Sequence, residues 1–220
     1  MKQLLLSRKY EILLSTLFIH LFIGIVLTDL HFYAKVIWPI NMFLLAIGST
    51  SLFIQKSKWE NRIQILLFSL AIALPLILPF FGHIPFFMEI LSVVYVILFG
   101  FLFYEVITYL IKPGKITIDI ISASACGFLL LLEIFVFGMQ FLFHLNPESI
   151  SKIDASSPAS IFIDLVYYCS VVLTTIGFGD ILPLTHHSKL FVVLMGWIGQ
   201  FYTVFLVGIL VGKFANLQSD

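Results

Sequence analysis

Long apolar segments, separated by short polar ones, follow one another along the whole chain. Each is long enough to cross the hydrocarbon core of a bilayer as an α-helix. The apolar segments cover about residues 12–28, 36–54, 63–81, 86–111, 116–143 and 189–211. Because a transmembrane barrel shows shorter segments of alternating hydrophobicity, the pattern predicts an all-α membrane protein with six transmembrane helices.

Polar residues and turn formers separate the predicted helices. We expect turns at Asp29–Lys35, Gln55–Arg62, Gly82–Pro85 and Lys112–Lys115. The last of these, with the sequence Lys-Pro-Gly-Lys, is the strongest turn signal in the chain. Pro39 falls in the first turn of the second predicted helix, where proline is tolerated.

One apolar segment is too short to cross a membrane. Residues 160–173 would form a helix about 21 Å long, and they follow a polar loop over residues 144–158. We predict a re-entrant helix whose N-terminal end lies near Pro158. The string Thr-Thr-Ile-Gly-Phe-Gly-Asp follows it at residues 174–180, and a second polar loop, 181–188, leads to the last helix.

Composition agrees with a membrane protein. Hydrophobic residues make up 60% of the chain, charged residues only 11%, and the mean hydropathy is +1.10, whereas soluble domains contain about 25% charged residues. The formal net charge is +0, which indicates no nucleic-acid partner. Cys126 and Cys169 lie in apolar segments, where buried thiols are expected rather than a disulfide. Residues 12–28 are longer than a signal-peptide core and no small-residue cleavage site follows, so we expect no cleavage.

The positive charges are distributed unequally between the two sides of the six-helix arrangement. Nine of the 12 Lys and Arg residues lie on the side of the N-terminus, and they are Lys2, Arg8, Lys9, Lys56, Lys58, Arg62, Lys112, Lys115 and Lys213. The other three are Lys35, Lys152 and Lys189. Cytoplasmic loops are enriched in Lys and Arg, so we predict that both termini are cytoplasmic, in a plasma membrane that the compact form suggests is prokaryotic.

Residues Thr174–Asp180 resemble the selectivity-filter signature of potassium channels. A dehydrated cation needs a cage of strong oxygen dipoles, which successive backbone carbonyls facing one axis provide. The carbonyls all face one way only if alternate residues adopt backbone angles that are costly with a Cβ, and Gly177 and Gly179 avoid this cost. From Ile116 onward, the order of helix, acidic loop, short helix, string, loop and helix is similar to the pore domain of the tetrameric potassium-channel family.

This resemblance implies a potassium-conducting homotetramer, in which three identical subunits are the partners of each chain. The potassium sites that it implies are the carbonyls of Thr175, Ile176, Gly177 and Phe178. The hydroxyl of Thr175 would complete the inner end, with Thr174 beneath it and Asp180 at the outer mouth. Membrane lipids are the other expected neighbours, K+ is the permeant ion, and no cofactor is expected.

Other residues of the predicted pore domain carry roles that the resemblance implies. Phe178 replaces the commoner tyrosine of the filter, which removes a hydroxyl that ties the filter to the surrounding helix. Tyr167 and Tyr168 stand where many family members have a tryptophan pair, and their hydroxyls either restrain the filter or Asp180, or the rings only pack. Gly199 lies nineteen residues after Asp180, where the family often has a gating-hinge glycine, and close helix packing is the alternative.

The chain divides into a four-helix domain (1–111), a linker (112–115), a pore domain (116–214) and a short cytoplasmic tail (215–220). The four-helix domain has as many predicted transmembrane helices as a voltage sensor. Its fourth helix, residues 86–111, would carry the sensor charges, but it contains no Lys or Arg. Each charge that crosses the field contributes about 2.3 kcal/mol per 100 mV, so we predict little voltage dependence. Because the tail is too short for a ligand-binding domain, gating is expected from the pore itself, lipid, tension or an unidentified partner.

Three functional hypotheses stay open: a potassium-selective channel, a weakly selective cation channel, and a membrane subunit of a potassium-uptake transporter. Such transporters usually carry several pore loops in one chain. Apart from His186-His187, which are expected as solvated loop residues, the histidines are scattered without nucleophile–base or metal-ligand spacing, so we expect no enzyme. Glu105 and Glu133 lie inside apolar helices and must be paired, protonated or close to water.

Overall fold

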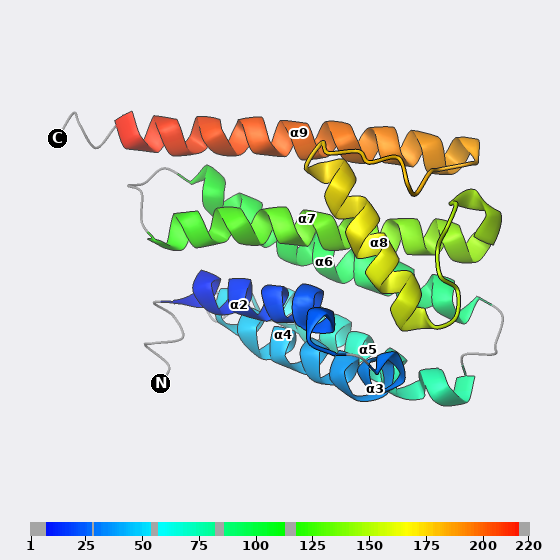
Figure 1. Ribbon diagram of the computed structural model, residues 1–220. Coiled ribbons are helices and arrows are strands. Elements are labelled where there is room, and N and C mark those ends of the chain that lie inside the picture. The colour runs from blue at the N-terminus through cyan, green and yellow to red at the C-terminus, as the bar shows by residue number, and fades with distance from the viewer. Residues whose placement is uncertain (1–7, 28, 54–56, 82–85, 113–117, 216–220) are drawn as a thin grey trace.

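The computed structural model describes residues 8–27, 29–53, 57–81, 86–112 and 118–215. The described chain consists of helices and their connecting loops, with one isolated β-bridge between Ile150 and Pro183. Figure 1 shows long helices side by side, with helix α8 running obliquely across them. The α-helices are α2 (Lys9–Phe22), α3 (Leu30–Phe32), α4 (Trp38–Phe53), α5 (Lys58–Phe81), α6 (Phe87–Ile111), α7 (Ile118–Leu145), α8 (Pro158–Leu173) and α9 (His186–Ala215).

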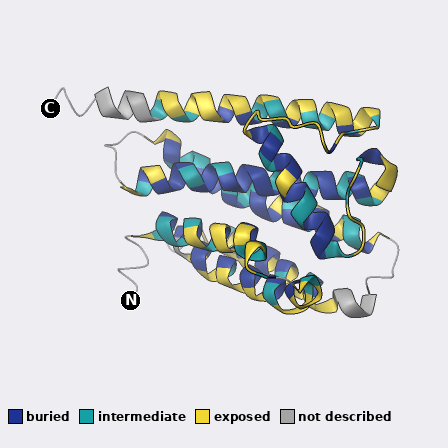
Figure 2. Ribbon diagram, viewed as in Figure 1, coloured by how far each residue is buried: buried dark blue, intermediate teal, exposed yellow. Residues whose placement is uncertain are grey.

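Helix α7 lies at the centre of the molecule, in contact with helices α2, α6, α8 and α9. It is apolar on nearly every side, as expected for a helix that protein surrounds. Of its membrane-spanning residues 78% are buried, against 17% for α9. Figure 2 shows the same contrast, with α7 mostly dark blue and α9 mostly yellow. Helix α9 therefore packs on α7 along one side and leaves the other side uncovered by its own chain.

Five helical segments are long and apolar enough to span a membrane, namely Leu30–Thr50, Lys58–Ile77, Phe87–Ile111, Ile118–Leu145 and His186–Ile209. They confirm the prediction of an all-α membrane protein. The first predicted span is shorter than expected. Helix α2 has 14 residues, about 21 Å, and a short 3-10 turn, Ile23–Ile25, follows it. By length, the described residues thus supply five spans rather than the predicted six.

The turn predicted before the second span is mostly helical, which corrects its boundary. Helix begins at Leu30 rather than after Lys35, because the Asp29 carboxylate accepts hydrogen bonds from two N–H groups of the first turn at 2.9 and 3.0 Å. A π-helical turn, Tyr33–Ile37, then precedes Pro39. Proline has no N–H to donate to the carbonyl four residues earlier, and the wider turn accommodates this missing bond.

The loop predicted at Gln55–Arg62 is also partly helical, since α5 begins at Lys58. Ser57 and Glu60 form a capping box that starts the helix. The N–H of Ser57 donates to Oε2 of Glu60 at 2.8 Å, and the N–H of Glu60 donates to Oγ of Ser57 at 3.3 Å. Four predicted features lie wholly or partly outside the described residues: the whole turn at 82–85, residues 55–56 of this loop, residues 113–115 of the linker and residues 216–220 of the tail.

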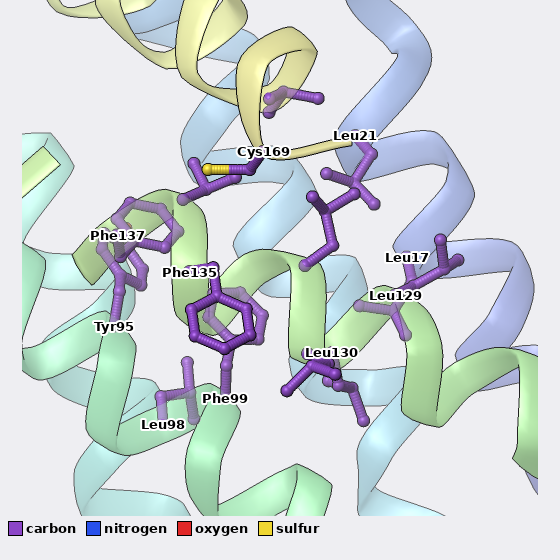
Figure 3. Close-up of a cluster of buried hydrophobic side chains, with 14 of the residues drawn as sticks. Leu17, Leu21, Tyr95, Leu98, Phe99, Leu129, Leu130, Phe135, Phe137 and Cys169 are labelled. Atoms are coloured by element: carbon purple, nitrogen blue, oxygen red, sulfur yellow. The ribbon is translucent and has the colours of Figure 1, made fainter. Parts of the chain in front are cut away.

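An aromatic cluster fills the space between α4, α6, α7 and α8. The ring centroids of Trp38 and Phe162 are 4.7 Å apart, and those of Tyr95 and Phe137 are 4.5 Å apart. Figure 3 shows Tyr95 and Phe137 side by side, with Cys169 of α8 nearby. Both cysteines of the described chain are buried and free, which confirms the expectation of buried thiols. The cluster therefore joins the short helix α8 to the first half of the chain.

Candidate functional site

Helix α8 carries the Thr174–Asp180 string at its C-terminal end. The helix begins with Pro158 at its first position, and Oγ of Ser157 accepts a hydrogen bond from the N–H of Ser160 at 3.1 Å. Its 16 residues make it about 24 Å long, which is less than the hydrocarbon thickness of about 30 Å. The predicted short helix and its start near Pro158 are confirmed.

The backbone N–H groups at the start of the string donate hydrogen bonds to the carbonyls in the last turn of α8. The N–H groups of residues 174–177 donate to the carbonyls of Ser170, Val171 and Val172 at 3.0 to 3.3 Å. No described group donates a hydrogen bond to the carbonyls of residues 175–178. The string is therefore anchored through its donors, while its carbonyl oxygens stay available as ligands.

The backbone of the string alternates in handedness. Thr175, Gly177 and Gly179 have φ values of 61°, 62° and 75°, whereas Ile176 and Phe178 between them do not have positive φ. Such alternation turns successive carbonyls toward the same side. The left-handed backbone predicted for the two glycines is present. A Cβ added at either glycine would meet no atom within 4 Å, so the backbone conformation, and not the space within one chain, requires glycine.

The positive φ of Thr175 was not predicted. For a residue with a Cβ this conformation costs about 1–2 kcal/mol, and such strain persists only where the surroundings impose it. The N–H of Thr175 donates to the carbonyl of Val172 at 3.0 Å, which helps to hold the conformation. Nothing in the local sequence distinguishes Thr175 from Thr174, so sequence alone carries no signal for it.

A tyrosine of α8 holds the outer end of the string. The hydroxyl of Tyr167 donates a hydrogen bond of 2.5 Å to Oδ2 of Asp180. This bond lowers the pKa of Asp180 below its ordinary value, because it favours the carboxylate. Tyr168 is buried, and its hydroxyl has no hydrogen-bond partner among the described residues. Of the two tyrosines singled out in the sequence, the structure brings only Tyr167 to Asp180.

Hydrogen bonds join the loop after α7 to the loop after the string, next to the β-bridge between Ile150 and Pro183. The N–H of Leu184 donates to the carbonyl of Ser149 at 2.8 Å, and the buried hydroxyl of Ser188 donates to the same carbonyl, also at 2.8 Å. Composition identifies both segments as loops but contains no signal for this pairing. The string is thus held at both ends, by α8 and by the paired loops.

Gly199 lies where α9 meets the end of α8. A Cβ added to Gly199 would lie 2.6 Å from Cδ2 of Leu173, the last residue of α8. Helix α9 continues through this position to Ala215. About one turn further, the hydroxyl of Tyr202 donates to the carbonyl of Ser124 in α7 at 2.7 Å. The geometry favours the close-packing alternative for Gly199, and the hinge stays a prediction.

The string and most of α9 form one exposed face of the chain (Figure 2). All residues of the string are exposed, and Phe178 retains 68% of its accessible surface. The large apolar side chains that α9 exposes are Leu190, Val193, Leu194, Trp197, Phe201, Val204, Phe205 and Val207. An apolar surface of this length requires cover by lipid or protein.

Comparison with known families now assigns a class. Residues 127–216 match the family model described as "Ion channel". This segment contains most of α7, the whole of α8, the string and α9, which is the part of the chain that forms the site. No curated protein and no solved structure gives a match to the chain. The class that the apolar helices and the family match define is an integral membrane ion channel, and not an enzyme.

Proposed function

We propose that this ion channel is selective for K+ and conducts it passively through a pore formed by four copies of the chain. The observation that carries the proposal is the string at residues 174–180, in which alternate residues are left-handed and the carbonyls of residues 175–178 accept no hydrogen bond from described groups. A row of such carbonyls can replace the hydration shell of a cation. The hydroxyl of Thr175 adds a ligand at the inner end.

Four copies are required because one chain supplies only one row of carbonyls, and a dehydrated ion must be surrounded. Closed symmetry about one axis brings four rows together. The exposed face formed by residues 174–180 and α9 supports this assembly, since its apolar side chains would then contact other copies. Each chain has three identical subunits as partners, and lipid covers the remaining apolar surface.

Both ends of the site favour cations. The C-terminal end of α8 carries a partial negative charge, which would stabilise a cation below the string. At the other end, the hydrogen bond from Tyr167 keeps Asp180 ionised. Because Asp180 is exposed, its effect is to raise the local cation concentration rather than to bind an ion tightly.

A weakly selective cation channel is the second candidate. It is favoured by Phe178, which lacks the hydroxyl that would otherwise restrain the filter, so that the carbonyl cage is less rigid. A transporter subunit fits less well, because these 220 residues contain one filter string. We further propose that both termini are cytoplasmic, in a prokaryotic plasma membrane. This requires the short helix α2 to count as a sixth crossing, and it is supported by Figure 1, in which α2 begins and α9 ends at the same end of the bundle. We also propose that the channel is not classically voltage-sensing, since α6 contains no Lys or Arg.

Reversal potentials in proteoliposomes, measured under K+ and Na+ gradients with and without barium, test the proposal. We expect the reversal potential to follow the K+ gradient and barium to block the current. A reversal potential that ignores the K+ gradient contradicts potassium selectivity.

Gly177→Ala tests the assignment of the filter itself. Because φ at Gly177 is 62°, alanine costs about 1–2 kcal/mol in every subunit, and we expect conduction to be lost. Gly100→Ala in α6 is the matched control, since its Cβ would meet no atom within 4 Å. If Gly177→Ala conducts as well as Gly100→Ala, the string is not the filter.

A further inference from the structure

A histidine and a glutamate meet in the interior of the molecule, on helices that are far apart in the sequence. His20 of α2 and Glu133 of α7 are both fully buried, and Nε2 of His20 lies 3.4 Å from Oε1 of Glu133. Among the described residues, no group forms a hydrogen bond with either side chain, and as placed the two are not hydrogen-bonded to each other. The 3.4 Å approach of Nε2 to Oε1 is therefore a polar contact between two buried, unsatisfied groups.

Aromatic rings surround this pair. The ring of His20 lies 5.6 Å from that of Phe162, 6.0 Å from Trp38 and 6.2 Å from Phe99, measured between centroids. The titratable side chains close enough to Glu133 to interact with it electrostatically are Tyr33 ahead of α4, Tyr95 of α6 and Cys169 of α8. None of these carries a positive charge, and no Lys or Arg of the described chain pairs with Glu133.

These surroundings decide which charge state the pair can hold. Two charges buried in such an apolar site need additional hydrogen bonds to offset the loss of hydration, and neither Glu133 nor His20 has them within the described chain. A bare carboxylate beside neutral His20 is less favourable still. The remaining state holds one proton and no net charge on either group, with the carboxylic acid of Glu133 able to turn its O–H toward Nε2 of His20.

We propose that His20 and Glu133 form a proton-binding site that holds one proton on Glu133, and that loss of this proton disturbs the pore helix α8 and stops conduction. Phe162 and Cys169 bring α8 to the pair, and they are seven residues apart, so they lie on one face of the helix. Ionisation of Glu133 would place an uncompensated charge against this face. The released proton passes to bulk water, and water or a shift of α8 must then solvate the carboxylate.

Infrared difference spectroscopy of the full channel in lipid tests the site without reference to ion selectivity. At about pH 7 an ordinary exposed glutamate, with a pKa of about 4.3, is ionised. We expect the carbonyl band of a protonated carboxylic acid at this pH, its loss in Glu133→Gln, and its retention in Glu148→Gln, which changes an exposed outer residue. Absence of a band that depends on Glu133 overturns the proposal.

His20→Gln is the second variant, which keeps the test valid should Glu133→Gln not assemble. It replaces the ring nitrogen by an amide, so the frequency of the Glu133 band should shift. An unchanged frequency shows that the two side chains do not interact, and it also overturns the proposal.

The link to conduction rests on the proposed channel function and is tested separately by K+ flux into proteoliposomes. We expect the flux of the wild-type channel to fall at alkaline pH, over the range in which the infrared band disappears, and we expect Glu133→Gln to abolish this fall. Flux that stays constant over that range, or that falls equally in Glu133→Gln, contradicts the link. An infrared band in a protein that conducts no K+ would instead count against the proposed function alone.

Discussion

Replacing Gly199 by alanine places a Cβ 2.6 Å from Cδ2 of Leu173. The leucine is only 3% exposed, so its side chain has little room to withdraw. Overpacking of this kind costs about 1–3 kcal/mol, which for a chain of this size lowers the melting temperature by about 2–12 °C. Gly196→Ala, on the same helix, is the matched control, because a Cβ there meets no atom within 4 Å.

A double-mutant cycle in detergent micelles identifies the contact responsible. Leu173→Val removes the atom that Gly199→Ala would contact, at its own cost of about 0.8 kcal/mol for the lost methylene. We expect the double variant to be more stable than the sum of the two single effects predicts, by about 1 kcal/mol or more. The readout is thermal unfolding followed by circular dichroism, with K+ flux measured in parallel.

The packing interpretation and the hinge interpretation predict different results. If Gly199 acts only as a hinge, alanine leaves the melting temperature unchanged, alters the flux, and is not rescued by Leu173→Val. A melting temperature for Gly199→Ala equal to that of Gly196→Ala, or strict additivity in the cycle, refutes the packing argument.

Three further predictions concern hydrogen-bonding side chains. Tyr167→Phe removes the bond that lowers the pKa of Asp180, so the carboxylate should lose its charge at a higher pH, and acid inhibition of K+ current should begin at a higher external pH than in the wild type. Ser188→Ala removes the buried bond to the carbonyl of Ser149 and also the acceptor for the N–H of Thr185, and it should cost at least about 1 kcal/mol, seen as a lower melting temperature; an unchanged value would mean that the loops do not depend on this hydroxyl. Ser57→Ala removes the cap of α5 and should cost about 1 kcal/mol, with loss of helical circular dichroism on heating at a lower temperature.

The helices could be predicted from sequence because backbone groups in a bilayer must be satisfied within each segment, so long apolar runs permit few structures. One error is the first predicted span, whose helix α2 already ends at Phe22, and two others lie at helix starts. Asp29 and the Ser57–Glu60 pair are polar residues that resemble loop composition, yet they cap helices that begin at Leu30 and Lys58. The Ser-x-x-Glu spacing was a capping signal that the sequence shows. The π-helical turn before Pro39 forms only because the helix continues from Leu30 into α4, and local sequence does not determine that continuation.

The same distinction applies to the site. The conformation of Gly177 and Gly179 was predictable, because it follows from what glycine permits. The choice between Tyr167 and Tyr168 was not, since adjacent residues of a helix point about 100° apart and only the packed position of α8 decides which one reaches Asp180. The pairing of the loop after α7 with the loop after the string was also not predictable, because it depends on how distant parts of the chain pack together.

Helix α8 is the element through which the first half of the chain contacts the site. The carbonyl of Ala71 in α5 accepts a 2.8 Å hydrogen bond from the hydroxyl of Tyr95, which accepts one of 3.1 Å from Nε1 of Trp38, and Trp38 packs on Phe162 of α8. Only 22% of the span in α5 is buried by the chain, so its outer surface faces lipid or another copy. Because packed interiors transmit displacement, we expect a force on α5 to reach α8 and the string after Leu173 although α6 contains no Lys or Arg.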